Sequence, residues 1–198
     1  MPGWEPIEGE TPQDDLSGFK RFHRFPNLTR VVINNLEAEN IRKATVKYLS
    51  RKPTKSSAPF SYAWLLRLHK EMYGDVWSWA GAPRQTATNV GVPAFQIPEA
   101  LQGMLLNLAH WENSLSETET AALLHHRAVQ IHPFLNGNGR WARMLANIWL
   151  KKNGQALTFW PTDIEHATQY RAAYLAALRA ADDTDLAPLT ALHRRFTA

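Results

Sequence analysis

The sequence predicts an all-α protein, and three observations support that fold class. Apolar residues recur with helical spacing along most of the chain. Capping residues precede several of these periodic stretches. Strand-like segments do not alternate with the helical ones, which argues against a parallel sheet. The chain has 198 residues, of which 44% are hydrophobic and 20% charged, and this composition is typical of one globular domain.

Caps and stops give the expected order of the helices. Asn34 or Asn35 can cap a first helix, over about 35–49, that ends before Pro53. Serine caps, a proline at a first helical position, a capping box at 116–119 and a final Asn-Gly pair bound the others. We expect these further helices at about 61–73, 98–111, 116–129, 139–153, 163–181 and 185–196.

Two stretches do not follow the helical pattern. Residues 1–30 are rich in Pro, Gly and acidic residues, which favours an extended N-terminal arm ahead of a single domain over 31–198. Residues 81–96 contain two glycines and two prolines with little periodicity. They are expected to form a loop or a short β-hairpin.

Composition excludes several classes of protein. The chain has no cysteine, so disulfide and thiolate chemistry are absent. No apolar run approaches the roughly 20 residues that span a bilayer, and the polar start is unlike a secretory signal. We therefore expect a cytoplasmic protein without membrane contact. The net charge of +4 comes from scattered basic residues, which favours a solvated basic surface over a nucleic-acid site. Zinc-protease, P-loop, nucleophile-elbow and dinucleotide motifs do not occur.

Residues 131–143, Ile-His-Pro-Phe-Leu-Asn-Gly-Asn-Gly-Arg-Trp-Ala-Arg, carry the candidate chemistry. Gly137 and Gly139 permit backbone angles and close approach that side chains forbid. Because a helix follows, backbone N–H groups and the helix end form a cradle for an anion. Arg140 and Arg143 share a helix face beside it and suit a polyphosphate. The pKa of a histidine such as His132 suits proton transfer.

This segment resembles the Fic signature, His-x-Phe-x-(Asp/Glu)-Gly-Asn-Gly-Arg-x-x-Arg. Further likeness lies in 68–81, Arg84, 95–98 and 170–188. The resemblance implies a Fic-like helical bundle with a β-hairpin flap. It also implies a protein adenylyltransferase that moves AMP from ATP to a Ser, Thr or Tyr hydroxyl. His132 would be the general base, and Phe134 would pack the loop into the core. The phosphates would be bound by Gly137, Asn138, Gly139, Arg140 and Arg143.

One position departs from the signature. Asn136 stands where the family has an acid that helps to hold Mg²⁺, and an amide oxygen lacks the charge that Mg²⁺ prefers. Asn136 is thus a weak Mg²⁺ ligand candidate, and the metal would rest mainly on ATP. The related Doc branch has Lys at the place of Gly139 and transfers phosphate, so Gly139 favours AMP transfer.

The resemblance also implies a docking flap and an inhibitory helix. The flap, with Arg84, Thr86, Thr88 and Val90, would pair with a target segment through backbone hydrogen bonds. Residues 35–40 resemble the inhibitory motif (Ser/Thr)-x-x-x-Glu-(Gly/Asn), with Glu39 and Asn40 at its end. Glu39 would pair with Arg143 in the place of the γ-phosphate. We expect Glu39→Gly to raise automodification.

Other readings stay open. Asn136 could leave a weakly active or inactive nucleotide-binding regulatory module, and the enzyme could use another nucleotide or remove AMP. Residues 4–11 resemble a Fic subgroup called mobile mystery protein B. That likeness implies a small DNA-binding companion protein. The partners would be ATP and a target protein, and whether the chain forms a homo-oligomer is not determined.

Overall fold

The computed structural model describes residues 16, 18–20, 29–161, 164 and 169–197. Over these residues the all-α prediction is confirmed, because the two β-bridges present, Phe19–Trp77 and Thr158–Thr197, are isolated. The helices, with one 3-10 turn labelled η2, are α1 (Arg30–Leu49), α2 (Tyr62–Tyr73), η2 (Ala94–Gln96), α3 (Ile97–Ser114), α4 (Glu117–Ile131), α5 (Asn138–Lys152), α6 (Gln169–Asp182) and α7 (Ala187–Arg195).

Helix α1 begins earlier than its expected cap. The Thr29 hydroxyl accepts a hydrogen bond from the Val32 amide at 3.3 Å, so Thr29 and not Asn34 or Asn35 is the N-cap. The buried face of α1 consists of Ile33, Glu37, Asn40, Ala44 and Tyr48. Two polar residues on that face weaken its apolar periodicity, which is why the start was misplaced.

The helices that flank the Gly-rich loop follow their predicted signals. Ser116 and Glu119 form the capping box of α4, with both reciprocal bonds present. Helix α4 ends at Ile131, and its C-cap His132 has a left-handed backbone with φ 51°. Helix α5 ends at Lys152, with Asn153 as its C-cap and the left-handed Gly154 after it. Residues 132–137 therefore form a short, defined loop between α4 and α5.

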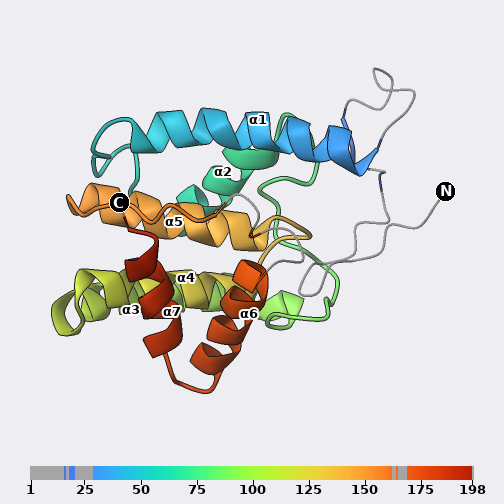
Figure 1. The fold of residues 1–198 in the computed structure, drawn as a ribbon. Helices are drawn as coiled ribbons and strands as arrows, with labels where there is room; N and C mark the ends of the chain where they lie inside the picture. The colour runs from blue at the N-terminus through green and yellow to red at the C-terminus, as the bar shows by residue number, and fades with distance from the viewer. Residues whose placement is uncertain (1–15, 17, 21–28, 162–163, 165–168, 198) are drawn as a thin grey trace.

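Helix α5 lies in the middle of the molecule (Figure 1). Helices α1 and α2 lie on one side of it and α3, α4, α6 and α7 on the other, and α5 packs on α1, α2 and α4. Most α5 residues are buried, including Trp141, Leu145 and Trp149. Because α5 sits between the two layers, residues at its N-terminus can be reached both from α1 and from α6.

The loop 81–96 differs from the expected β-hairpin. It contains bends and then the turn η2, without paired strands. Its backbone donors bond to the α4–α5 loop instead: the Arg84 amide to Pro133 O at 2.9 Å and the Val92 amide to Ile131 O at 3.3 Å. The flap is thus fastened at both ends to the segment that carries His132.

Most of the predicted N-terminal arm lies outside the described residues. The part that is described packs on the domain, because Phe19 is buried with its ring edge-on to Trp77 at 5.5 Å. Lys20 Nζ also donates to Gly74 O at 2.6 Å. The predicted start of α6, at about 163, likewise lies among residues that are not described, and α6 is seen from Gln169.

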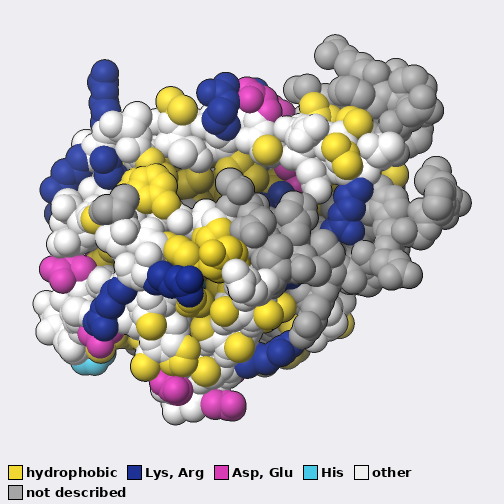
Figure 2. Space-filling view, in the orientation of Figure 1, with side chains coloured by type: hydrophobic (Ala, Val, Ile, Leu, Met, Phe, Trp, Pro, Cys, Tyr) yellow, Lys and Arg dark blue, Asp and Glu magenta, His cyan; other side chains and the backbone are white. Residues whose placement is uncertain are grey.

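In the part of the chain that the structure describes, no helix is both long and apolar enough to cross a bilayer. Lys and Arg side chains are scattered over the face seen in Figure 2 and do not form one block. This distribution agrees with the expected solvated basic surface.

Candidate functional site

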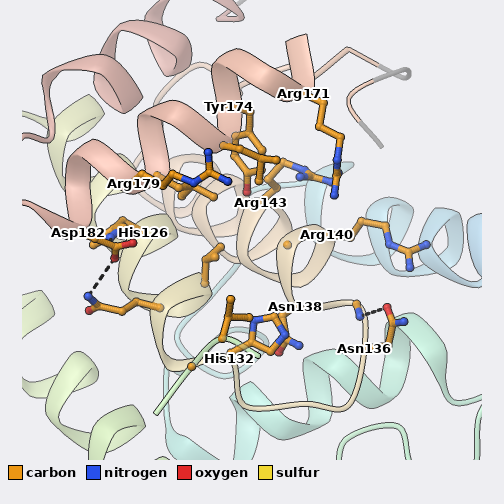
Figure 3. A pocket seen from close by; sticks show the side chains of 18 residues that line it. His126, His132, Asn136, Asn138, Arg140, Arg143, Arg171, Tyr174, Arg179 and Asp182 are labelled. Carbon is orange, nitrogen blue, oxygen red and sulfur yellow. Dashed lines mark hydrogen bonds and ion pairs between the residues drawn. The ribbon is translucent and has the colours of Figure 1, made fainter. Parts of the chain in front are cut away.

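A cavity of about 350 Å³ opens between the Gly-rich loop, α4, α5 and α6. Its wall brings together most of the predicted site residues, among them His132, Arg140 and Arg143 (Figure 3). The volume lies at the lower end of the range for small-molecule sites. The lining residues are Val90, Gly91, His126, Val129, Gln130, His132, Asn136–Arg140, Arg143, Arg171, Tyr174, Leu175, Leu178, Arg179 and Asp182.

Two positions determine the shape of the Gly-rich loop. Gly137 has no side chain, and the side chain of Asn138 is hydrogen-bonded within the loop. Gly137 has φ 79°, and a Cβ there would lie 2.6 Å from the Tyr73 ring, so only glycine fits. The Asn138 side chain accepts from the Phe134 amide at 2.9 Å and donates to the Phe134 carbonyl at 2.8 Å. Asn138 therefore braces the loop, which corrects the expectation that its amide binds the phosphates.

Phe134 holds the loop to the core as expected. It is fully buried, stacks on His69 with ring centroids 3.6 Å apart, and meets Trp141 edge-on at 5.1 Å. His69 Nδ1 accepts from the Gly81 amide at 3.0 Å, so Nε2 donates to Asn136 O at 3.0 Å. Burial lowers the pKa of His69 to about 3. This neutral imidazole therefore links α2, the flap and the loop.

His132 is a buried, neutral imidazole at the edge of the cavity. Burial, together with the nearby Arg84 guanidinium, lowers its pKa to about 4, although a backbone hydrogen bond with Val129 acts in the opposite direction. At neutral pH His132 is thus unprotonated and can accept a proton. A Cβ on Gly91 would lie 2.5 Å from His132 Cβ, so the flap backbone covers His132 closely.

Arg84 lies beneath the flap instead of on its outer face. Its guanidinium donates to His132 O at 2.7 Å, to Thr86 O at 2.9 Å and to Val92 O, and the residue is 2% exposed. This corrects the expectation that Arg84 docks a target. Thr86 and Val90 are exposed, and the Thr88 hydroxyl donates to Val90 O at 2.6 Å. These three residues remain on the accessible part of the flap.

Arg140 is held by an acid from α1. Its Nη1 donates to Glu37 Oε2 at 2.6 Å, and Trp77 Nε1 donates to Glu37 Oε1 at 2.6 Å. The Glu37 side chain is 2% exposed, so this is a buried, hydrogen-bonded carboxylate. The Arg140 guanidinium also lies over the Tyr73 ring, 5.2 Å from its centroid. Figure 3 shows the Arg140 side chain turned toward α1 and away from Arg143.

Arg143 is held from the opposite side, by Tyr174 of α6. The guanidinium lies over the Tyr174 ring, 5.4 Å from its centroid. Arg171 and Arg179 of α6 line the same cavity. Four arginines from two helices therefore surround it, which suits a ligand with several negative charges.

The predicted inhibitory residues are placed elsewhere. Glu39 is exposed and pairs with Arg42 through two bonds of 2.9 Å, so its predicted pairing with Arg143 is wrong. Asn40 is buried, but it ties α1 to the end of α2: it donates to Glu71 O and accepts from the Asp75 amide, both at 2.9 Å. The acid of α1 that reaches a site arginine is Glu37.

Asn136 is the only predicted metal ligand among the described residues. Groups of three or more His, Cys, Asp or Glu that could hold a metal are absent from the residues seen in this structure. The Asn136 side-chain oxygen accepts a hydrogen bond from the Gly137 amide. A single neutral amide oxygen engaged with its own backbone is a poor Mg²⁺ ligand.

Several cavity residues on α6 were not predicted. Arg171, Tyr174, Leu178 and Asp182 follow helical spacing and form one face. Asp182 accepts from His126 at 2.8 Å and from Gln130 at 3.1 Å. A test of that face for mixed charged and apolar residues could have found them, but nothing in the sequence shows that α6 folds over the Gly-rich loop.

The comparisons with known proteins agree with this geometry. Residues 59–150 match the Fic/DOC family. The protein adenylyltransferase Fic of Drosophila grimshawi is 33% identical over 130 residues, which is 63% of this chain and 26% of that protein. Protein adenylyltransferase fic-1 of Caenorhabditis elegans is 32% identical over 63% of this chain and 24% of the relative. The chain thus spans about a quarter of the length of these relatives.

Two solved structures share the fold. C. elegans Fic-1 (residues 134–508) has a TM-score of 0.69 at 22% identity, covering 89% of this chain and 53% of that one. The BepC protein of Bartonella tribocorum, solved with bound AMPPNP, has a TM-score of 0.67 at 21% identity and covers 98% and 95% of the two chains. Residues 59–150 of this chain are therefore similar to the Fic/DOC family, and the chain shares the fold of these two solved proteins.

Proposed function

We propose that this chain transfers AMP from ATP to a Ser, Thr or Tyr hydroxyl of a protein. The observation that carries the proposal is that a neutral, buried His132 shares one cavity with a Gly-rich helix start and four arginines. Two relatives, of whose length this chain covers about a quarter, are named protein adenylyltransferases. A protein of the same fold was solved with bound AMPPNP. Both support ATP as the substrate.

The reaction needs little covalent help from the protein. The hydroxyl oxygen of the target attacks the α-phosphorus, a new O–P bond forms, and the bond to pyrophosphate breaks. His132 accepts the hydroxyl proton, which is why its lowered pKa matters. Arg140 and Arg143 neutralise the β- and γ-phosphates as pyrophosphate leaves. The amides at the start of α5 hold the phosphate oxygens.

Other components of the proposal follow from the substrate. Mg²⁺ enters with ATP, bound mainly by phosphate oxygens, because Asn136 is a poor ligand as placed. Thr86, Thr88 and Val90 of the flap face the target segment. A cytoplasmic location, where ATP is available, and a DNA-binding companion protein stay predictions, as does a homo-oligomer.

Glu37 replaces Glu39 as the inhibitory residue in this proposal. Glu37 is buried and holds Arg140 at 2.6 Å, so a phosphate has to compete with a carboxylate for that guanidinium. Competition between anions for one arginine lowers the fraction of ATP bound in a productive pose. Removal of the carboxylate should therefore raise the transfer rate.

Intact-mass measurement of the full chain, incubated with ATP and Mg²⁺, tests both parts. We expect an added AMP unit on Glu37→Gly, none on Glu37→Gly with His132→Ala, and wild-type behaviour for the matched control Glu39→Gly. A parallel incubation with labelled ATP and a cell lysate detects transfer to other proteins. ATP binding without transfer in any variant, in either assay, would contradict the enzyme and support the nucleotide-binding module.

A further inference from the structure

A chain of neutral polar side chains runs from the core to the Gly-rich loop on the α6 side. The Thr158 hydroxyl lies 2.9 Å from His193 Nδ1, and His193 Nε2 lies 3.1 Å from His125 Nδ1. His125 Nε2 lies 2.9 Å from the Tyr174 hydroxyl. All four residues are buried. They come from four parts of the chain, α4, α6, α7 and the segment after α5, so only the folded protein brings them together.

The chain ends at the phosphate cradle. The Arg143 guanidinium lies over the Tyr174 ring, 5.4 Å from its centroid. A Cβ placed on Gly139, at the start of α5, would lie 3.6 Å from Arg143 Nη1 and 3.9 Å from the Tyr174 hydroxyl. Both groups therefore lie over the glycine that opens the helix. A hydrogen-bond chain that fixes Tyr174 also fixes the position of Arg143 relative to the cradle.

Both imidazoles of this chain can be neutral. When the Tyr174 hydroxyl donates to His125 Nε2, His125 Nδ1 donates to His193 Nε2 and His193 Nδ1 donates to the Thr158 hydroxyl oxygen. The same contacts are satisfied with every donor reversed. Each imidazole in either arrangement carries one proton and is neutral, and burial lowers the pKa of both histidines.

We propose that Tyr174 and His125 are positioning residues that hold Arg143 ready for the terminal phosphates of the nucleotide. The inference rests on the proposed use of ATP. Arg143 otherwise has a long side chain whose freedom would be lost on binding. Because the chain holds the guanidinium before the ligand arrives, that entropy is already lost. The neutral partner holds Arg143 without cancelling its charge, so the triphosphate gains the full attraction.

The decisive experiment compares nucleotide affinities of folded variants by calorimetry, with ATP and AMP as the two probes. Tyr174→Phe keeps the ring beneath Arg143 and removes the hydroxyl. We expect ATP to bind about tenfold more weakly, because the ring beneath Arg143 loses its hydrogen bond to His125. We expect the affinity for AMP, which lacks the terminal phosphates, to stay the same. The matched control is Tyr170→Phe, on the same helix, whose ring packs on Phe196 at 5.9 Å.

A second pair of variants tests the chain beyond Tyr174. His125→Leu breaks it and should repeat the loss seen in Tyr174→Phe. His125→Gln keeps a polar group near Tyr174 and should restore part of the ATP affinity. In Glu37→Gly protein, Tyr174→Phe should raise KM for ATP more than it lowers kcat. An unchanged ratio of ATP to AMP affinity in Tyr174→Phe would overturn the inference. Absence of ATP binding by the wild type would instead overturn the proposed function.

Discussion

The two arginines of the Gly-rich helix start are held in opposite ways. On the α1 side, Arg140 pairs with the buried carboxylate of Glu37 at 2.6 Å. On the α6 side, the Arg143 guanidinium lies over the ring of Tyr174, 5.4 Å from its centroid. The two side chains are one helical turn apart and line the same cavity, but Arg140 pairs with a carboxylate and Arg143 packs on an aromatic ring.

The two partners should affect phosphate binding by their arginines in different ways. A carboxylate neutralises its arginine, so an incoming phosphate has to displace it. An aromatic ring orients its arginine and leaves the positive charge in place. Under the proposed function, the α1 side therefore opposes nucleotide binding in the productive pose, and the α6 side supports it.

The largest expected difference is in stability. Arg140→Ala leaves the buried Glu37 carboxylate with its hydrogen bond from Trp77 but without the cation, and should lower the free energy of unfolding by about 3 kcal/mol. Arg143→Ala removes a cation that lies over the neutral Tyr174 ring, a loss of about 1 kcal/mol. Urea denaturation measures both. The double variant Arg140→Ala with Glu37→Gln should recover most of the loss. Equal losses in the two single variants would contradict the difference between the partners of Arg140 and Arg143.

A lower pH should destabilise the hydrogen-bond chain that runs from Thr158 through His193 and His125 to Tyr174. The pKa of His193 falls from 6.5 to about 3 because it is buried, so the unfolded state binds more protons between these values. Stability is therefore full above pH 6.5 and falls as the pH is lowered toward 3. From pH 7 to pH 5 this one group should remove about 2 kcal/mol of unfolding free energy.

Urea denaturation of His193→Gln at the two pH values isolates that contribution. The variant should lose less stability between pH 7 and pH 5 than the wild type does. His110→Gln is the control, because His110 is exposed on α3 and its replacement should leave the wild-type pH dependence unchanged. The same pH dependence in all three proteins would show that His193 is not a buried neutral group.

Glu37→Gln should raise AMP transfer by about tenfold, since a neutral amide competes less with phosphate for Arg140. Labelling with ATP at several concentrations measures the rate. The change should appear mainly in the rate at saturating ATP, because the proposed inhibition acts on the pose of bound ATP. A rate equal to that of the wild type, with the fold intact, would remove Glu37 from the inhibitory role.

Glu39→Gln should change neither labelling nor thermal stability. Glu39 and Arg42 are exposed partners three residues apart on α1, and such pairs contribute little. The measurements are the labelling rate and the unfolding midpoint, each compared with the wild type and with Glu37→Gln. A rise in labelling would return the inhibitory role to Glu39 and contradict the placement of α1.

Glu37 and Glu39 show why the prediction of the acid that pairs with a site arginine was wrong. Residues two apart on a helix point to different sides, so only one of the two acids can face α5. The motif comparison at 35–40 favoured Glu39. The buried series Ile33, Glu37, Asn40 and Ala44 has helical spacing, and it would have favoured Glu37 if a buried acid had been allowed on that face.

The sequence alone determined the local chemistry of this protein. Caps, glycines and the order His132 to Arg143 depend on neighbours along the chain, because helix ends, left-handed turns and a helix-start anion cradle are local structures. Tertiary structure decided which partners those residues meet. Glu37 reaches Arg140 across 103 residues, and His125 reaches His193 across 68. Such contacts depend on how helices pack, which side-chain spacing within one helix does not encode.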